Sequence, residues 1–317
     1  MEHSTDAVDV IVVGGGPAGL SAALLLSRAR RRVVVIDDGR PRNAYAAHMH
    51  GVLGHDGLPP RRLLELGSQE ISGYGGRFEQ GTASALTVRD DAVEVSMTTT
   101  ETRLRARRVL VATGLTDELP DIPGLRDQWG RGVVVCPYCD GWEHRLDVVG
   151  VIATSPRSVE QAQLLRQWSE RVVYFPGAFG EPDSEDAAAL ADRGIRIELG
   201  DVAGLRIDGD QVTGVDLGDR VVSVGVIFVG TRLRPHDSLL RAVGATATED
   251  ETGSWITVDD DGQTSVRGVY AVGNVVNPRS NVSVSLGLGT LVGGSINLDL
   301  LADDIAQTRR TTRRAAG

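Results

Sequence analysis

Apolar and polar positions along the first forty residues follow the pattern of an α/β unit. Residues 9–13 (DVIVV) are apolar on both faces, which predicts a buried strand of a parallel sheet. The apolar positions of residues 20–29 recur at helical spacing, and residues 33–36 form a second apolar run. The chain therefore predicts a strand, a helix and a second strand in that order.

The same order of elements returns in the middle of the chain. Residues 147–152 predict a strand, residues 158–168 a helix and residues 172–175 a second strand. Residues 224–231 then form an apolar run that ends in glycine and threonine, as residues 108–114 do in the first half. We interpret this as a duplicated α/β architecture with two Rossmann-like dinucleotide-binding domains, each built in three layers (ββα).

Other segments predict elements around these two units. Residues 63–71 have helical spacing, and residues 93–95 and 99–104 read as the two strands of a hairpin. Residues 270–274 predict a final strand and turn, which a glycine-rich, helix-like stretch follows through residue 299. The basic tail, residues 309–317, has few apolar positions and is expected to be frayed.

Composition excludes several classes of protein. The net charge of −10 argues against a nucleic-acid partner, because it implies no basic surface. All 33 basic residues are arginine, which excludes Schiff-base chemistry and a Walker lysine. We expect no signal peptide, no membrane-spanning segment and a cytoplasmic location, where a pair of cysteines is more often catalytic than structural.

A glycine pattern follows the first strand and opens the first helix. Gly14, Gly16 and Gly19 give G-x-G-x-x-G, and Asp37 ends the second strand. In a dinucleotide fingerprint the first glycine allows the turn, the second admits the pyrophosphate and the third allows close helix packing. The helix N-terminus attracts phosphates, and an acid at the position of Asp37 binds ribose hydroxyls. The sequence therefore predicts an intact dinucleotide site in the first domain.

The second unit lacks this pattern. Its turn is read as residues 150–156 (GVIATSP), in which Gly150 alone survives and Ile152 stands where the backbone would approach a pyrophosphate. The loop 176–181 offers no arginine for a 2′-phosphate and no immediate acid for a ribose. We expect the second nucleotide site to be disabled.

The only two cysteines of the chain lie in the sequence Cys136-Pro-Tyr-Cys139. This spacing favours a redox disulfide, since a zinc knuckle would need a second CxxC and none exists. Asp140 follows directly and could exchange protons with a thiolate. His144 is a further candidate for this proton exchange.

Three histidines, His48, His50 and His55, lie within eight residues of a glycine-rich loop. Without a nearby carboxylate motif beyond Asp56, contact with cofactor or substrate is favoured over a metal site, and loop filler stays open.

These motifs together resemble the low-molecular-weight thioredoxin reductase family of two-domain flavoproteins over nearly the whole chain. The matching segments are GGGPAG (14–19), ATG (112–114), CPYCDG (136–141) and AVGN (271–274). The resemblance implies an FAD domain of residues 1–117 plus 242–317, an NAD(P)-binding-like domain of residues 118–241 that carries the CxxC, and a homodimer. It implies these flavin-site residues: Gly14, Gly16, Pro17, Ala18, Gly19, Asp37, Arg42, Asn43, His50, Ala83, Ala112, Thr113, Gly114, Gly273, Asn274, Val282 and Ser283.

Within this superfamily the chain is most similar to the dithiol oxidases of holomycin- and gliotoxin-type natural products, which form disulfides and pass the electrons to oxygen. This implies attack of a small dithiol on Cys136, with Cys139 nearer the flavin, and Asp140, His144 or His50 as proton acceptor. Asn274 stands where the family usually has aspartate, and some oxidases have histidine at the position of Asp140. An NAD(P)H-dependent disulfide reductase and a redox-sensing flavoprotein without turnover are the alternatives.

Overall fold

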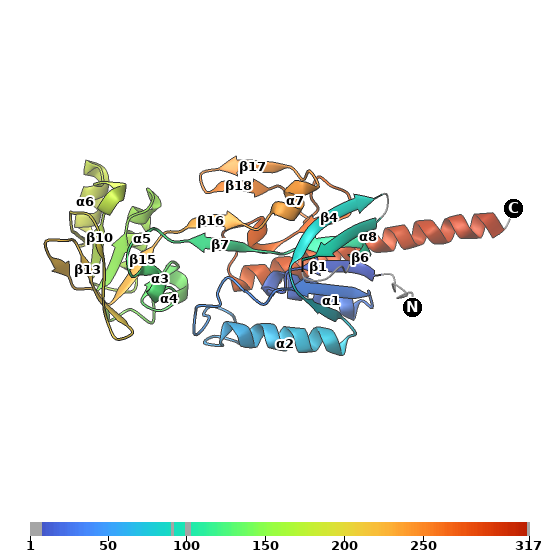
Figure 1. Ribbon diagram of the computed structural model, residues 1–317, viewed down its shortest axis with the longest axis horizontal. Coiled ribbons are helices and arrows are strands. Elements are labelled where there is room, and N and C mark those ends of the chain that lie inside the picture. The colour runs from blue at the N-terminus through green and yellow to red at the C-terminus, as the bar shows by residue number, and fades with distance from the viewer. Residues whose placement is uncertain (1–7, 90–91, 99–102, 316–317) are drawn as a thin grey trace. The chain divides into compact units, whose positions relative to one another are not determined.

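The computed structural model describes residues 8–89, 92–98 and 103–315, which divide into two compact units (Figure 1). The first unit contains the chain up to Arg42, then Arg61–Thr116, and the chain from Leu233 onward. The second contains Asn43–Pro60 and Asp117–Arg232. The chain crosses between the units in β7 (Leu115–Glu118) and β16 (Arg232–Pro235), which pair with each other.

This division differs in two places from the predicted boundaries. The second unit ends at Arg232 and not at residue 241, because the helix α7 (Ser238–Ala242) buries Leu239 and Leu240 in the core of the first unit. The loop Asn43–Pro60, which was assigned to the first domain, belongs to the second unit.

The first unit is organised around a central parallel sheet. The strands predicted at residues 9–13 and 33–36 are both present. The first lies between the second and the strand Arg103–Val111. The parallel strands are, in spatial order, β3 (Arg77–Gln80), β2 (Val33–Asp37), β1 (Val8–Val13), β6 (Arg103–Val111) and β19 (Val269–Ala271).

The strand β6 takes part in two layers. Its first residues pair antiparallel with β5 (Ala92–Met97), which pairs with β4 (Ala83–Arg89), while its last residues lie between β1 and β19. The segments 99–104 and 108–114, which the sequence separated, are therefore one strand from Arg103 onward; residues 99–102 lie outside the described part.

Helices cover one face of the parallel sheet. The helices α1 (Pro17–Arg28) and α2 (Pro60–Gly73) supply buried side chains such as Leu26 and Ile71 to that face. The antiparallel strands β4 and β5 lie on the opposite face, so the unit has the ββα layers that the sequence predicted. Two short elements complete the unit, the hairpin of β17 (Ala247–Asp250) with β18 (Gly253–Ile256) and the 3-10 turn η2 (Gly273–Val275).

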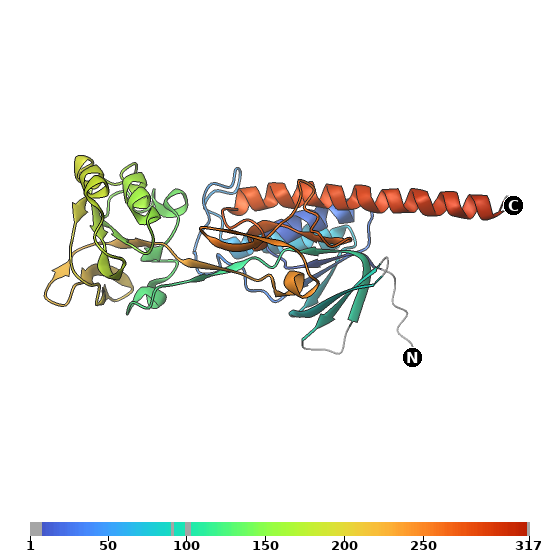
Figure 2. The same cartoon turned by 90° about the horizontal axis from the view of Figure 1, so that it is seen from above.

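The last helix, α8 (Val282–Ala315), is longer than predicted and runs along the first unit, with its C-terminal turns extending past the strands (Figure 2). The expected fraying from residue 309 is wrong for the described residues, which stay helical to Ala315. By length and composition alone α8 could also span a membrane, a criterion that buried core helices meet as well, so the expectation of no membrane-spanning segment stays a prediction. The residues Val292, Ile296 and Leu300 of this helix are at most 3% exposed, as in the core helix of a water-exposed domain.

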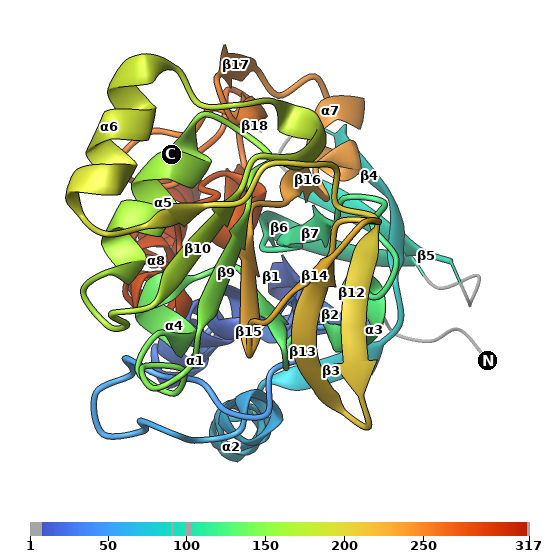
Figure 3. The same ribbon diagram turned by 90° about the vertical axis from the view of Figure 1, so that its left-hand side faces the viewer.

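The second unit repeats the arrangement of the first (Figure 3). Its parallel sheet has, in spatial order, β11 (Arg196–Ile197), β10 (Val172–Phe175), β9 (Val149–Ile152), β15 (Val226–Val229) and β8 (Val133–Val134). One face packs against α5 (Arg157–Leu165) and α6 (Ser184–Asp192), and the other against the antiparallel strands β12 (Gly204–Asp208), β13 (Gln211–Asp216) and β14 (Val221–Val222). The short helices α3 (Leu125–Gln128) and α4 (Pro137–Asp140) and the 3-10 turn η1 (Gly177–Phe179) lie in its loops.

Candidate active site

The glycine turn after β1 is built as a cradle. Gly14 has φ +109°, and a Cβ there would lie 2.3 Å from the carbonyl oxygen of Ala112. A Cβ at Gly19 would lie 2.0 Å from the carbonyl oxygen of Gly14, so α1 can pack this closely only through glycine. At Gly16 a Cβ would meet nothing within 4 Å, so the backbone there faces open space.

The N-terminus of α1 is left open for an anion. No side chain caps it, and its first turn contains no acidic residue. Its first amide groups therefore keep their hydrogen atoms available, and the helix dipole favours negative charge at this point. The open space at Gly16 and the uncapped amides together fit the pyrophosphate of a dinucleotide.

Asp37 fastens this turn to the next loop. Its Oδ1 accepts a hydrogen bond from the amide of Gly15 at 2.8 Å, and its Oδ2 accepts one from the amide of Gly39 at 3.1 Å. Each carboxylate oxygen can accept a further bond, so contact of Asp37 with a ribose hydroxyl stays a prediction.

The turn at the end of β19 is fixed by Asn274. Its amide nitrogen donates to the carbonyls of Asn277 (3.0 Å) and Ser280 (2.9 Å), and its Oδ1 accepts from Nη1 of Arg42 at 3.2 Å. An aspartate, the usual residue of the family, could not donate to these carbonyls. The neighbouring Gly273 packs its backbone against the N-terminal turn of α1, where a Cβ would lie 3.0 Å from that of Ala18.

The third turn of the first unit follows β6. The hydroxyl of Thr113 donates to the carbonyl of His236 at 2.7 Å, and the imidazole of His236 contacts the Thr113 carbonyl (3.0 Å) and the Thr116 hydroxyl (2.8 Å). Thr113 is thus tied to a residue that the sequence analysis did not single out, because 123 positions separate the two.

The remaining predicted flavin residues divide between the two units. Pro17 and Ala18 begin α1, Val282 and Ser283 begin α8, and Ala83 begins β4, all in the first unit with Ala112 and Gly114. Asn43 and His50 lie in the second unit. Their contact with a flavin stays a prediction.

Two equivalent hydrogen bonds show which residues of the second unit correspond to the glycine fingerprint of the first. The amide of Gly14 donates to the carbonyl of Ile36 at the end of β2, and the amide of Ala153 donates to the carbonyl of Phe175 at the end of β10. The fingerprint positions of the second unit are therefore Ala153, Ser155 and Ser158.

The prediction that Gly150 is the first fingerprint glycine is wrong. Gly150 lies inside β9, and a Cβ there would lie 2.7 Å from Cδ1 of Ile227, so this glycine serves core packing. Ile152 is the last residue of the strand and not a turn residue.

Ser158 closes the second turn. Its hydroxyl oxygen accepts hydrogen bonds from the amides of Thr154 (3.1 Å) and Ser155 (3.4 Å), and the residue is 3% exposed. The amides of Thr154 and Ser155 at this turn are thus bonded to the protein's own side chain.

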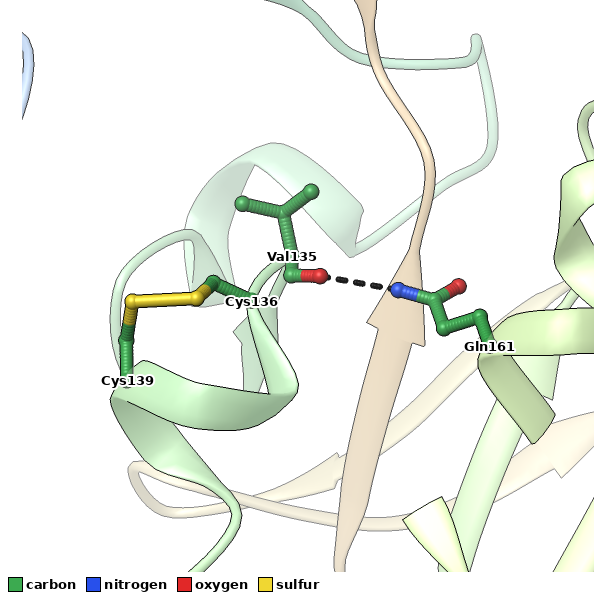
Figure 4. The surroundings of a disulfide bond; sticks show 4 residues. All are labelled: Val135, Cys136, Cys139 and Gln161. Carbon is green, nitrogen blue, oxygen red and sulfur yellow. Dashed lines mark hydrogen bonds between the residues drawn. A yellow bond between two sulfur atoms is a disulfide. The ribbon is translucent and has the colours of Figure 1, made fainter. Parts of the chain in front are cut away.

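The two cysteines form a disulfide at the start of α4, with their Cα atoms 5.2 Å apart (Figure 4). Cys136 caps the helix, and its carbonyl accepts from the amides of Cys139 (3.0 Å) and Asp140 (3.2 Å). The preceding carbonyl, that of Val135, accepts from the side-chain amide of Gln161 on α5 at 2.8 Å. The predicted redox pair is confirmed as a disulfide, and Gln161 joins its support to α5.

Comparison with known proteins agrees with these features. Residues 8–289 match the family described as pyridine nucleotide-disulphide oxidoreductase. The chain belongs to this family. Two fungal relatives, thioredoxin reductase tcpT of Claviceps purpurea (strain 20.1) and thioredoxin reductase sirT of Leptosphaeria maculans, are each 28% identical, over 95% and 94% of this chain and 96% of their own length. The crystal structure of HlmI is similar with a TM-score of 0.94 and 43% identity, over 100% of this chain and 99% of that one. The protein is a flavin-dependent disulfide oxidoreductase with a thioredoxin reductase-like fold.

The surroundings of Asp140 move the pKa of its carboxyl toward neutral pH. Burial raises the pKa of its carboxyl to about 6, while His144 and His50 oppose this rise and Glu143 adds to it. A group that titrates near neutral pH can both accept and return a proton under ordinary conditions. His144 is less free, because its Nδ1 lies 2.8 Å from Oδ2 of Asp147.

The surface after the disulfide is rich in exposed large side chains. Tyr138, Trp142 and Leu146 are 63–74% exposed. The guanidinium of Arg145 lies 4.2 Å above the ring of Trp142, and Tyr138 makes an edge contact with Trp168.

Proposed function

We propose that the protein is an FAD-dependent dithiol oxidase that closes an intramolecular disulfide in a small natural-product dithiol, with oxygen as electron acceptor and hydrogen peroxide as product. The observation that carries this proposal is the contrast between the two turns. The first is open at Gly16 and uncapped, whereas the second is closed by Ser158. A reductase needs a place for NAD(P)H, and the bonding of the Thr154 and Ser155 amides to Ser158 supports the view that this turn does not serve as one.

FAD would be held by the cradle at Gly14–Gly19, by Asp37 and by the turn at Asn274. When bound, it would accept the two electrons that the reduced cysteine pair holds and pass them to oxygen. The similarity to HlmI over the whole chain, together with the resemblance to dithiol oxidases of natural-product pathways, supports this assignment.

The chemistry of the chain itself is thiol–disulfide exchange. A substrate thiolate attacks the sulfur of Cys136, the Cys136–Cys139 bond breaks, and Cys139 leaves as a thiolate. The second substrate thiol then attacks the substrate sulfur of the mixed disulfide, which releases a cyclic disulfide and Cys136. Asp140 as a carboxylate takes the proton of an attacking thiol and returns it to the leaving cysteine, so thiol protons and electrons balance over the two exchanges.

Anaerobic stopped-flow mixing tests the proposal. A small dithiol such as dithiothreitol is expected to bleach the flavin rapidly, and NADPH or NADH is expected to leave it oxidised. An oxygen electrode should then record oxygen uptake with dithiol alone. Rapid bleaching by NADPH would refute the oxidase assignment.

The alternative is an NAD(P)H-dependent disulfide reductase, which the names of the two fungal relatives favour. It requires nicotinamide oxidation coupled to a disulfide acceptor. A redox-sensing flavoprotein, the third possibility, would give no steady turnover with any dithiol.

We also propose that the oxidase is a homodimer, since an exposed apolar stripe follows the outer face of α8. Val284, Leu291, Leu298 and Ile305 are seven residues apart and 42–66% exposed, while the opposite face is buried in the core. Gly287 and Gly294 lie between them, and a Cβ at either would meet nothing within 4 Å. A stripe with this repeat matches the seam between paired helices.

A second copy is the partner that this stripe fits. Leu301, which lies between Leu298 and Ile305, is 44% exposed and extends the apolar stripe. Leu298→Asp is expected to convert the protein to a monomer in light scattering, with Leu199→Asp, an exposed leucine of the second unit, as the control. A dimer that persists in Leu298→Asp would contradict this assignment.

The two-cysteine composition and a disulfide that is used in catalysis fit a cytoplasmic location.

A further inference from the structure

The helix α5 is held firmly in the core of the second unit. Its residues Val159, Ala162 and Leu165 are at most 6% exposed and pack in one cluster with side chains of β9, β10 and β15. At its beginning, Ser158 accepts hydrogen bonds from the amides of the preceding turn. The helix is therefore a fixed support for any segment that attaches to it.

The first attachment of the redox segment to α5 lies just before Cys136. The pairing of β8 with β15 ends at Val134, whose partner is Phe228, so the carbonyl of Val135 lies beyond this ladder. The half-buried side chain of Gln161 on α5 donates its amide hydrogen to this carbonyl at 2.8 Å (Figure 4). The bond fixes the chain at the point where it enters the redox pair.

The second attachment lies just after Cys139 and Asp140, in the turn that follows α5. Gly141 packs so closely on Trp168 that a Cβ at Gly141 would lie 2.9 Å from Cδ2 of the indole. The ring of Tyr138 meets that of Trp168 edge-on, with the centroids 5.5 Å apart. Trp168 is itself held by its amide, which donates to the carbonyl of Leu165 at 3.0 Å. The redox segment is thus attached at both of its ends to α5 and the turn after it.

We propose that Gln161 is a positioning residue which, together with Trp168, keeps the two thiols of the reduced enzyme close to each other and so favours reclosure of the Cys136–Cys139 bond. Neither attachment involves a sulfur atom, so both can persist when the disulfide opens. Two reacting groups that are held together react as if each were present at a high concentration. The inference concerns the redox pair itself and holds for either direction of electron flow, so it does not rest on the proposed function.

The test compares the disulfide equilibrium of wild type and Gln161→Met, which keeps a side chain of similar length but has no hydrogen to donate. The holoenzyme is equilibrated without oxygen in buffers of reduced and oxidised dithiothreitol. In this exchange the Cys136–Cys139 bond forms, the disulfide of oxidised dithiothreitol breaks, and two electrons and two protons pass to dithiothreitol. Acid quenching, alkylation and mass spectrometry then give the fraction of enzyme with a closed disulfide.

Gln161→Met is expected to lower the equilibrium constant for disulfide formation about threefold to tenfold, the factor that one hydrogen bond typically contributes. A tenfold change corresponds to a reduction potential about 30 mV more positive. Gln161→His, whose Nε2 can donate from a similar position, should recover part of the loss. Trp168→Leu should shift the equilibrium in the same direction as Gln161→Met. The matched control is Gln167→Met, an exposed glutamine just after the same helix, which should follow the wild type.

An equilibrium constant for Gln161→Met that equals the wild-type value would overturn the inference, and so would an equal loss in Gln167→Met. Urea unfolding of the oxidised and reduced forms separates positioning from plain structural support. Equal destabilisation of both forms by Gln161→Met would show structural support alone and would also overturn the inference. If Trp168→Leu does not fold, the two Gln161 variants decide. Absence of oxygen uptake by the wild type would refute the oxidase and leave this equilibrium unaffected.

Discussion

Replacement of Asp140 by asparagine is expected to stabilise the protein above pH 6 while it slows thiol–disulfide exchange. Burial raises the pKa of this carboxyl from 3.8 to about 6, so the folded protein holds the proton more tightly than the unfolded chain does. The contribution of Asp140 to the free energy of unfolding is therefore largest below about pH 4, falls as the pH rises from about 4 to about 6, and is lost above that. Asparagine does not titrate and escapes this loss.

The size of the effect follows from the shift. A rise of about two pKa units, at about 1.36 kcal/mol each, corresponds to about 3 kcal/mol of destabilisation by the ionised carboxylate. The difference between Asp140→Asn and the wild type should be near zero below pH 4 and complete above pH 6. In turnover, by contrast, Asp140→Asn should be slower than the wild type, because the carboxylate of Asp140 is the form that accepts a thiol proton.

Thermal unfolding at pH 4 and pH 8 checks this reasoning, with dithiol-dependent flavin reduction measured in parallel. Asp56→Asn is the control of opposite sign, because the Gly51 amide and His50 hold the pKa of Asp56 below its usual range. It should give no stabilisation at pH 8. An Asp140→Asn variant that melts like the wild type at pH 8, or that gains equally at pH 4, would refute the assignment of a buried, proton-exchanging carboxyl.

Three further substitutions test other parts of the structure. Cys139→Ser should retain the substrate as a stable mixed disulfide on Cys136, seen as an added mass in intact-protein mass spectrometry; no adduct would argue against Cys136 as the attacked sulfur. Ser158→Ala should cost about 1 kcal/mol in urea unfolding, because two amides lose their acceptor, and an unchanged midpoint would contradict its role in closing the second turn. Arg108→Ala should cost about 3 kcal/mol, because Asp299 and Asp303 lose the 3%-exposed guanidinium between them, whereas Arg62→Ala, at an exposed pair, should stay within about 1 kcal/mol.

The first nucleotide turn and the disulfide could be predicted from the sequence because both are local. Gly14 and Gly19 are needed at their positions by backbone geometry within one strand–turn–helix segment, and Gly16 leaves open space beside the turn. Cys136 and Cys139 are near neighbours in the chain, so their pairing required no knowledge of the rest of the fold. Apolar runs such as β1, β2 and β10 were predicted for the same reason, since each buries both faces of a short strand.

Features that depend on distant residues were missed or misplaced. Gly150 was taken for a turn glycine because its role, contact with Ile227 on β15, is a packing relation across the sheet. The helix α8 continues past the predicted residue 299, and Asp304 there pairs with Arg31 and Arg107 from elements far back in the chain.

The sequence alone therefore determined the duplicated architecture, the open first turn and the redox pair, since backbone sterics and short-range spacing specify each of them. The tertiary structure decided which residues occupy the second turn and that His50 faces Glu143. These two relations depend on contacts of Ala153 with Phe175 and of His50 with Glu143, residues far apart in the chain that no local pattern connects.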